Sequence, residues 1–327
     1  MHLLHAKTFK LHSFFGSDIP SYAILSHGWG DSEITFQELE CDHDVELAKA
    51  NVKIAGCCTQ AVADGYEHVY KEALICYVYM SDVSVKAPGS ENYRRSFRRS
   101  AWFTRGWTLQ ELLAPDMIVF YDQAWIDIGT KATLESEIKA ATKITQLFDF
   151  SEVCIAQKMS WAAQRKTARV EDEAYCLMGI FGVNMPILHG EGAKAFLRLQ
   201  QEILEQSDDE SIFAWESACH LDSNSSGMLA RNAADFGHAG DIIRLHLKGA
   251  PVFPFEMTNK GLRIRLQLMP IGVPESSADV SELEFLASLR CRRRSIPYPL
   301  AIKLKSRADS PVSFTGFFVH IDCRSCD

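Results

Sequence analysis

The sequence predicts an α/β fold in which a parallel sheet is followed by added helices and then by a small β-rich region. The first observation is that short apolar runs alternate with helical patterns between residues 20 and 121. The second is a purely helical pattern from about residue 133 to residue 206. The third is a strict apolar–polar alternation over residues 262–268, which is typical of a half-exposed strand.

The first predicted strand covers residues 21–26, a short apolar run that follows Pro20. It leads into His27, Gly28, Trp29 and Gly30, a loop whose glycines allow a backbone to approach a ligand closely. A tight turn that carries a tryptophan explains the same residues. The pattern alone does not separate the two interpretations.

The next segments continue the alternation of strands and helices. The expected elements are a helix at 45–63, strands at 66–69, 74–80 and 117–121, and a basic amphipathic segment at 93–100. Ligands of such sheets bind at the carboxyl ends of the parallel strands. The candidate site therefore lies near Ser26, Asp82 and Glu111.

Residues 105–115 place one carboxylate, Glu111, in a short apolar helix that Pro115 ends. Thr108 and Glu111 have the spacing of a capping box, in which the glutamate reaches back to a backbone amide at the start of the helix. A carboxylate among apolar residues is either such a cap or a functional group. The local sequence favours the cap.

Four helices and three strands are expected beyond residue 133. The helices cover 134–141, 152–165, 170–180 and 194–206, and the strands cover 262–268, 300–304 and 312–321. Glu171, Asp172 and Glu173 open the third helix, where negative charge complements the helix dipole. We therefore expect a structural role for these acidic residues.

The bulk properties argue against several classes of protein. The net charge of −8 is unfavourable for nucleic-acid binding through phosphate contacts, and we expect the basic clusters at 94–99 and 290–294 to be solvated. No apolar run reaches the roughly 18 residues of a membrane span, and no signal peptide is recognisable. The ten cysteines then indicate reduced thiols and a cytoplasmic location. Cys323 and Cys326 form a lone CxxC pair, so no metal site is expected.

Five stretches together resemble the fungal heterokaryon-incompatibility (HET) domain. They are residues 22–29 (YAILSHGW), 76–83 (CYVYMSDV), 105–115 (RGWTLQELLAP), 169–182 (RVEDEAYCLMGIFG) and 189–200, which contains HGEG and AFLRLQ. These motifs stand in the family's order, and the stretch at 257–262 looks like the β-rich region that often follows this domain. The resemblance implies a HET domain at 1–210 and a β-rich region at 211–327.

The HET family acts in non-self recognition that ends in programmed cell death, a form of fungal innate immunity. Its fold is thought to be related to that of TIR domains, which have a flavodoxin-like parallel sheet, and some TIR domains cleave NAD at the nicotinamide ribosyl bond. Their catalytic glutamate lies in a Trp-Cys-x-x-Glu-Leu motif, which residues 107–112 resemble. The resemblance thus places Glu111 in the catalytic role of a TIR-like NADase. It implies NAD as a substrate and no tightly bound cofactor.

The resemblance also implies a set of binding residues, each with a structural alternative. The candidates are Ser26, His27, Gly28, Trp29, Asp82, Arg105 and Trp107. Trp29 or Trp107 would stack on a base or on the nicotinamide unless it packs in the core. Arg105 would pair with the pyrophosphate unless it forms a surface ion pair, and a role in a turn explains Asp82 as well. Ser26 and His27 are neighbours on a strand and point to opposite faces, which excludes a serine–histidine dyad.

The chain departs from the HET pattern between residues 69 and 70. HET domains usually have a strand, a loop and a helix there, and a crossover between parallel neighbours needs a dozen or more residues. The runs at 66–69 and 74–80 therefore cannot be parallel neighbours through this link. The departure leaves a second hypothesis open, a non-catalytic signalling module. Under both hypotheses we expect self-association and a regulatory protein that acts in trans.

Overall fold

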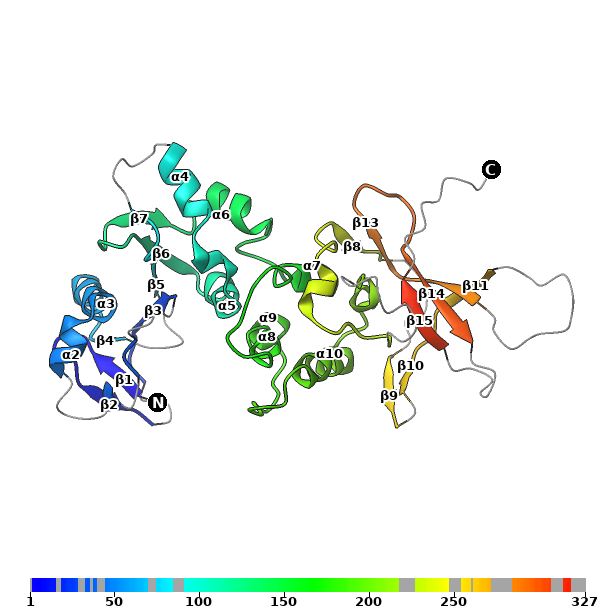
Figure 1. Ribbon diagram of the computed structural model, residues 1–327, viewed down its shortest axis with the longest axis horizontal. Helices are drawn as coiled ribbons and strands as arrows, with labels where there is room; N and C mark the ends of the chain where they lie inside the picture. Colours follow the sequence, from blue (N-terminus) through cyan, green and yellow to red (C-terminus); the bar gives the residue numbers. More distant parts are fainter. Residues whose placement is uncertain are drawn as a thin grey trace, which may run out of the picture. The chain divides into compact units, whose positions relative to one another are not determined.

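The computed structural model describes residues 2–15, 19–28, 33–35, 38–39, 45–69, 75–84, 91–217, 227–246, 254–259, 261–271, 284–306 and 314–318. The chain divides into two compact units, Met1–Phe148 and Asp149–Asp327 (Figure 1). We call them unit 1 and unit 2.

Unit 1 is built on a seven-stranded mixed sheet with the strand order β2-β1-β4-β3-β5-β6-β7 (Figure 1). The strands are β1 (His2–His5), β2 (Leu11–Ser13), β3 (Ala23–His27), β4 (His68–Val69), β5 (Ile75–Tyr79), β6 (Met117–Tyr121) and β7 (Asp127–Thr130). β3 is parallel to β4 and to β5, and β5 is parallel to β6. The α/β class is therefore confirmed.

The sheet is not purely parallel, so that part of the prediction is wrong. The pairs β1–β2, β1–β4 and β6–β7 are antiparallel. Residues 6–10 join β1 to β2, and residues 122–126 join β6 to β7. Both connections are shorter than the dozen residues of a parallel crossover, so the joined strands form hairpins.

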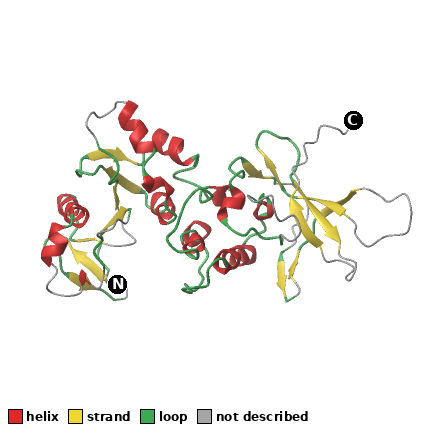
Figure 2. Ribbon diagram, viewed as in Figure 1, coloured by secondary structure: helices red, strands yellow, loops and turns green. Residues whose placement is uncertain are grey.

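Helices cover both faces of this sheet (Figure 2). They are α2 (Val45–Ala50), α3 (Val52–Ala63), α4 (Glu91–Arg98), the 3-10 helix η1 (Ala101–Thr104), α5 (Trp107–Leu113) and α6 (Glu135–Thr142). On one face, Cys57 of α3 belongs to the same buried cluster as Val69 and Tyr77. On the other face, the ring of Phe97 from α4 packs edge-on against Phe120 of β6. Alternate residues of each central strand thus enter two different cores.

The short link at residues 70–74 joins two strands that lie on opposite sides of β3. Val69 of β4 and Ile75 of β5 both pair with Ala23 of β3. The prediction that the two runs are not neighbours through this link is confirmed. Neighbouring strands lie about 4.8 Å apart, so β4 and β5, one on each side of β3, lie roughly 10 Å apart.

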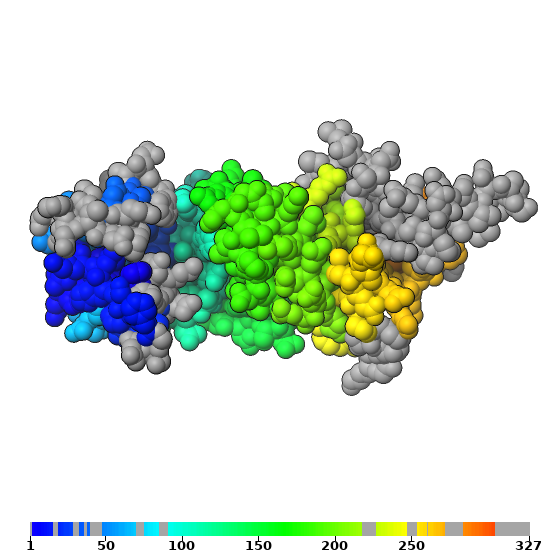
Figure 3. Space-filling model, turned by 90° about the horizontal axis from the view of Figure 1, so that it is seen from below, coloured from blue at the N-terminus to red at the C-terminus, as the bar shows by residue number. Residues whose placement is uncertain are grey.

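Unit 2 begins with a group of short helices. They are α7 (Ile155–Ser160), α8 (Asp172–Tyr175), α9 (Met178–Phe181), α10 (Lys194–Gln206), and the 3-10 helices η2 (Glu210–Phe213) and η3 (Ala233–Phe236). The green residues of Figure 3, which include α7 to α10, form one continuous mass. The helix expected at 170–180 is divided, because Cys176 and Leu177 separate α8 from α9. Gly182 ends α9 with φ +67°, a conformation that glycine adopts without strain.

The remaining strands of unit 2 form three small antiparallel sheets. β8 (Ile242–Arg244) pairs with β13 (Cys291–Arg293), and β9 (Glu256–Thr258) pairs with β10 (Gly261–Arg263). The four-stranded sheet has the order β11 (Gln267–Ile271), β12 (Glu284–Ser288), β14 (Ala301–Ser306) and β15 (Phe314–Phe318). The strand expected at 262–268 is divided between β10 and β11. η2, η3 and β8 pack against α7, so the helical and β-rich parts share this unit, and the predicted family boundary at residue 210 stays a prediction.

The described cysteines are free and buried, as expected for reduced thiols. They are Cys57, Cys58, Cys76, Cys154, Cys176 and Cys291. Burial raises the pKa of the Cys58 thiol to about 12, so this group remains protonated at neutral pH. Cys323 and Cys326 lie outside the described residues.

Candidate functional site

The carboxylate of Glu111 binds the hydroxyl of Ser26 at the carboxyl end of β3. Ser26 Oγ donates a hydrogen bond to Glu111 Oε2 at 2.5 Å. Ser26 is 1% exposed, while Glu111 is half-buried. Ser26 is the fourth residue of β3 and points toward α5, the helix that carries Glu111. Two of the predicted site residues, 85 positions apart in the chain, therefore meet.

A buried tryptophan fixes the orientation of Ser26. The indole Nε1 of Trp102 donates to Ser26 Oγ at 2.8 Å. A serine hydroxyl has one proton and two lone pairs. Ser26 thus accepts from Trp102 and directs its own proton to Glu111, which holds the carboxylate in one position.

Asp82 does not contact Ser26 or Glu111 in the hydrogen bonds given above, and it binds the start of η1, the 3-10 helix that contains Trp102. Its carboxylate accepts from Ser100 Oγ at 2.6 Å and from the backbone N–H of Ala101 at 2.7 Å. Ser100 in turn caps η1 by accepting from the backbone N–H of Trp102 at 3.3 Å. Asp82 therefore secures the start of the 3-10 helix that presents Trp102. The predicted contact of Asp82 with a ligand stays a prediction.

The capping box predicted for Thr108 and Glu111 is wrong. α5 begins at Trp107, its N-cap residue is Gly106, and no side chain caps the helix there. Thr108 lies inside the first turn, and its hydroxyl donates to the carbonyls of Trp102 at 2.6 Å and Arg105 at 2.9 Å. Thr108 is thus bound by the carbonyl groups of residues 102 and 105, and the carboxylate of Glu111 accepts from Ser26.

His27 and Gly28 lie beside a second polar cluster on the opposite face of β3. His27 Nε2 lies 3.1 Å from Glu33 Oε2, and Lys53 Nζ forms an ion pair with the same carboxylate. Lys53 Nζ also donates to the carbonyl of Gly28 at 2.9 Å. Burial lowers the pKa of His27, and the charges of Lys53 and Arg105 lower it further, while Glu33 opposes them. Ser26 and His27 contact different partners, which confirms that they form no dyad.

Arg105 lies against Gly28, so the cationic group predicted for a pyrophosphate is next to the predicted loop. A Cβ atom placed on Gly28 would be 3.8 Å from a guanidinium nitrogen of Arg105. Trp107 is half-buried at the start of α5. Trp29 lies outside the described residues.

Three residues of this region were not predicted as part of the site: Trp102, Lys53 and Glu33. Trp102 belongs to η1, before the helix of Glu111. Lys53 is the second residue of α3, whose N-cap residue is Asn51. Their roles depend on contacts with residues far away in the chain, for which a single sequence gives no signal.

Lys131 holds the other end of α5. Its ammonium group donates to the carbonyls of Leu113 at 3.4 Å and Pro115 at 3.2 Å. Burial lowers the pKa of Lys131, and Asp116 opposes that effect. The helix of Glu111 is therefore anchored at its carboxyl end by a cation from another element, as the helix dipole favours.

The motif at 169–192 forms a polar clasp in unit 2. Glu171 Oε1 accepts from the backbone N–H of Gly190 at 3.0 Å, and this contact lowers the pKa of Glu171. Glu191 accepts from Tyr175 and, at 2.5 Å, from Arg198. These bonds tie the loop before α10 to α8. They agree with the structural role expected for this motif.

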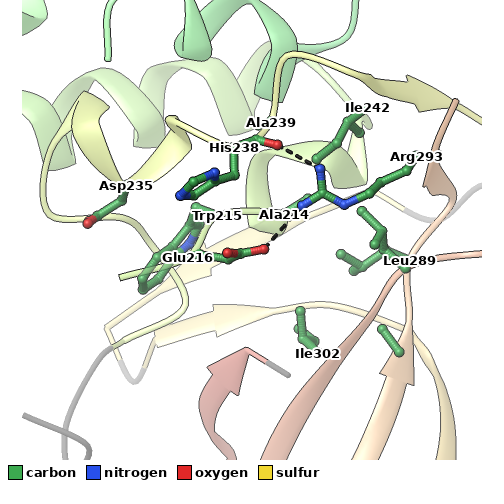
Figure 4. A pocket seen from close by; sticks show the side chains of 12 residues that line it. Ala214, Trp215, Glu216, Asp235, His238, Ala239, Ile242, Leu289, Arg293 and Ile302 are labelled. Carbon is green, nitrogen blue, oxygen red and sulfur yellow. Dashed lines mark hydrogen bonds and ion pairs between the residues drawn. The ribbon is translucent and has the colours of Figure 1, made fainter. Parts of the chain in front are cut away.

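A small cavity of about 30 Å³ lies elsewhere in unit 2 (Figure 4). Arg293 enters it and donates to the carbonyl of His238 at 2.8 Å and to Asp241 Oδ1 at 2.7 Å. The same guanidinium lies 3.2 Å from Glu216. The volume suits one or two water molecules, and the charges are paired, so we assign this cavity a structural role.

Neither a metal centre nor a membrane span is found in the part of the chain that the structure describes. No three His, Cys, Asp or Glu side chains among the described residues are arranged to hold a metal ion. None of the described helices combines the length and the apolar character needed to cross a bilayer.

Together these features define an α/β protein with an oriented carboxylate at the carboxyl end of a central parallel strand. Over 223 residues the chain is 37% identical to vegetative incompatibility protein HET-E-1 of Podospora anserina. The match covers 57% of this chain and 16% of that relative. This similarity supports a relationship to fungal heterokaryon-incompatibility proteins, of which the chain spans a small part.

A family model described as a domain of unknown function (DUF8212) matches residues 194–236. Its limits coincide with the start of α10 and the end of η3. No solved structure matches the chain.

Proposed function

We propose that the chain is an effector of fungal heterokaryon incompatibility that hydrolyses the nicotinamide ribosyl bond of NAD with Glu111. The similarity to HET-E-1 supports the role in incompatibility. The hydrogen bond from Ser26 to Glu111 carries the enzymatic part. It holds a carboxylate at the sheet edge where α/β proteins bind their ligands.

The reaction converts NAD and water into ADP-ribose, nicotinamide and a proton. The bond between ribose C1′ and the pyridinium nitrogen breaks with both electrons passing to the ring, which becomes neutral. Water then adds its oxygen to C1′ and releases a proton. Since the leaving group starts as a cation, no general acid is needed. One carboxylate suffices to stabilise the oxocarbenium character of the ribose.

The geometry around Glu111 suits this role. A carboxylate has about four acceptor positions, so the bond from Ser26 orients Glu111 without exhausting them. Arg105 beside Gly28 supplies a cation for the pyrophosphate, since guanidinium groups bind phosphate oxygens in pairs. Trp107, at the start of the same helix, offers an aromatic face for the nicotinamide or the base.

The purified full chain incubated with NAD tests the proposal. Nicotinamide and ADP-ribose are expected in equal amounts when the products are separated by chromatography. TIR-like enzymes often need assembly, so the assay is run over a range of protein concentrations. If no nicotinamide appears at any concentration, including those at which the chain self-associates, the enzymatic proposal is wrong.

A second candidate function is a non-catalytic signalling module that acts by self-association. Exposed apolar side chains favour it, because they surround the polar clasp of unit 2: Val170, Ile187, Leu188 and Leu197, with exposed fractions of 61, 53, 49 and 40%. Exposed apolar surface that is contiguous marks interaction sites. Glu171 follows Val170 in the sequence, and Arg198 follows Leu197. Their hydrogen bonds to Gly190 and Pro186 hold the loop that contains Ile187 and Leu188.

Light scattering on the full chain tests this second function. The average mass is expected to rise with concentration, and Leu188→Asp is expected to lower the association constant at least tenfold, because it places a charge in the apolar contact. Met257→Asp, at an exposed apolar residue on β9 of the same unit, serves as the control. A wild-type mass that stays monomeric at every concentration, or equal association by Leu188→Asp and wild type, contradicts it.

A further inference from the structure

Three histidine rings gather over the first strands of the unit 1 sheet. His5 of β1, His12 of β2 and His68 of β4 have ring centroids 5.0 to 5.3 Å apart. His5 pairs with His68 across the strands, so both rings point to one face. Leu4 and Val69, the neighbouring pair, point to the face that α3 covers. We call these three residues the histidine triad.

The contact between His12 and His68 requires one ring nitrogen to donate a hydrogen bond and the other to accept it. His12 Nδ1 lies 3.2 Å from His68 Nε2, so one of these atoms donates and the other accepts. His68 is 6% exposed, and its Nδ1 has no hydrogen-bond partner in the described part of the chain. A buried N–H without an acceptor is costly. His68 therefore carries its proton on Nε2 and donates it to His12.

His5 accepts hydrogen bonds from the turn between β1 and β2. Its Nδ1 accepts from the backbone N–H groups of Thr8 at 3.1 Å and Lys7 at 3.3 Å. A proton on this nitrogen would face two donors and break both bonds. A proton on His12 Nδ1 would likewise break the contact with His68. A proton added at His5 Nδ1 or His12 Nδ1 thus removes a bond of the hairpin β1–β2, and one added at His68 Nδ1 creates a buried N–H without an acceptor.

The charges near His68 set the direction of its response to pH. Burial lowers the pKa of His68, the charges of His5 and His12 lower it further, and Glu67, which precedes it in the chain, opposes them. The folded pKa therefore lies below the value of about 6.5 for an exposed histidine. The stability that neutral His68 contributes is present above pH 6.5 and is lost as the pH falls through its folded pKa.

We propose that the histidine triad is a proton-sensitive latch that holds the hairpin β1–β2 on β4 at neutral pH and releases it on mild acidification. His12 of the hairpin contacts His68 of β4 directly, and the β1–β4 pairing covers only Leu4 and His5. β4 borders β3, the strand of Ser26 and His27. Release would therefore uncover a strand edge next to the candidate site.

Hydrogen exchange of the full chain, followed by mass spectrometry, tests the latch. Protection of the peptide that covers residues 2–13 is compared at pH 7.5 and pH 5.5 after correction for intrinsic exchange rates. The protection factor is expected to fall at least about tenfold from pH 7.5 to pH 5.5. Uptake of one proton by the open state, at a histidine with a pKa near 6.5, favours that state by this factor over the two pH units. Protection of β6, at Met117–Tyr121, is expected to stay unchanged.

The triple variant His5→Asn, His12→Asn, His68→Gln is the decisive comparison. Asn and Gln place an acceptor or donor where these histidines have theirs but do not titrate. Its protection at 2–13 is expected to change less than twofold between the two pH values. If the triple variant does not fold, His68→Gln alone is measured, and its protection at 2–13 is expected to change less between the two pH values than that of wild type. His2→Asn, in the same hairpin but outside the triad, is expected to behave as wild type.

Three results would overturn the latch. One is equal wild-type protection of residues 2–13 at both pH values. Another is a variant lacking the triad that loses as much protection as wild type. The third is a parallel loss in β6, because that result indicates general acid unfolding.

Discussion

A Glu111→Gln variant is expected to release nicotinamide from NAD about a hundredfold to a thousandfold more slowly than wild type. Glutamine keeps the size of the side chain and an oxygen that accepts from Ser26. It removes the negative charge that the oxocarbenium-like transition state requires. The loss is expected in kcat more than in KM, because the charge develops on the ribose only during bond breaking.

Two further variants separate catalysis from folding. Ser26→Ala keeps the carboxylate but removes its orienting donor, so a smaller loss of roughly tenfold is expected. Glu135→Gln, at an exposed residue of α6 in the same unit, is expected to match wild type. If Glu111→Gln retains more than a third of the wild-type rate, Glu111 is not the catalytic residue. A melting temperature equal to that of wild type shows that an observed loss is not due to unfolding.

Trp102→Ala is expected to destabilise unit 1 by about 3–5 kcal/mol, the usual effect of truncating a buried tryptophan. Trp102 is 2% exposed, and its ring packs edge-on against Phe103 and Phe120 at centroid distances of 5.2 and 5.7 Å. The substitution leaves a cavity between η1 and the sheet. It also leaves Ser26 without its donor. Urea unfolding, followed by the fluorescence of the remaining tryptophans, measures the change.

Trp102→Phe distinguishes the volume of the indole from its hydrogen bond. It keeps much of the aromatic contact, so a cost of about 1–2 kcal/mol is expected. It removes the bond to Ser26, so NAD cleavage is expected to fall as in Ser26→Ala. Phe15→Ala, at a residue 80% exposed, is the control and should change stability by less than about 0.5 kcal/mol. If Trp102→Ala is no less stable than this control, the core assignment is wrong.

Local sequence patterns predicted the elements of the candidate site but not all of their contacts. The strand at 21–26 and the helix at 105–115 were placed by hydrophobic periodicity, and both exist as β3 and α5. Ser26 was predicted at the end of a strand and Glu111 in a helix near these strand ends, and the fold brings the two side chains into contact. The capping box is absent because α5 begins at Trp107, which places Thr108 inside the first turn and not at the N-cap. Sequence spacing describes the neighbours along one helix and not the loop that folds over it.

The edges of the sheet were predicted less well than its centre. Central strands are buried on both faces and appear as apolar runs, which is why β3, β5 and β6 were recognised. β1 and β2 contain three histidines among short apolar stretches, and no periodic pattern marks them. The pairing of β2 with β1 and of β1 with β4 appears only in the fold, and so does the histidine triad.

By itself, the sequence determined the α/β class, the central strands, and a carboxylate in an apolar helix. These features depend on the period of apolar residues and on residues close together in the chain. The tertiary structure decided the role of that carboxylate. Ser26 lies 85 residues from Glu111 and 76 from Trp102, and such contacts form only when β3 and α5 pack together. Ser26 of β3 therefore helps to orient Glu111 from outside the helix that carries it.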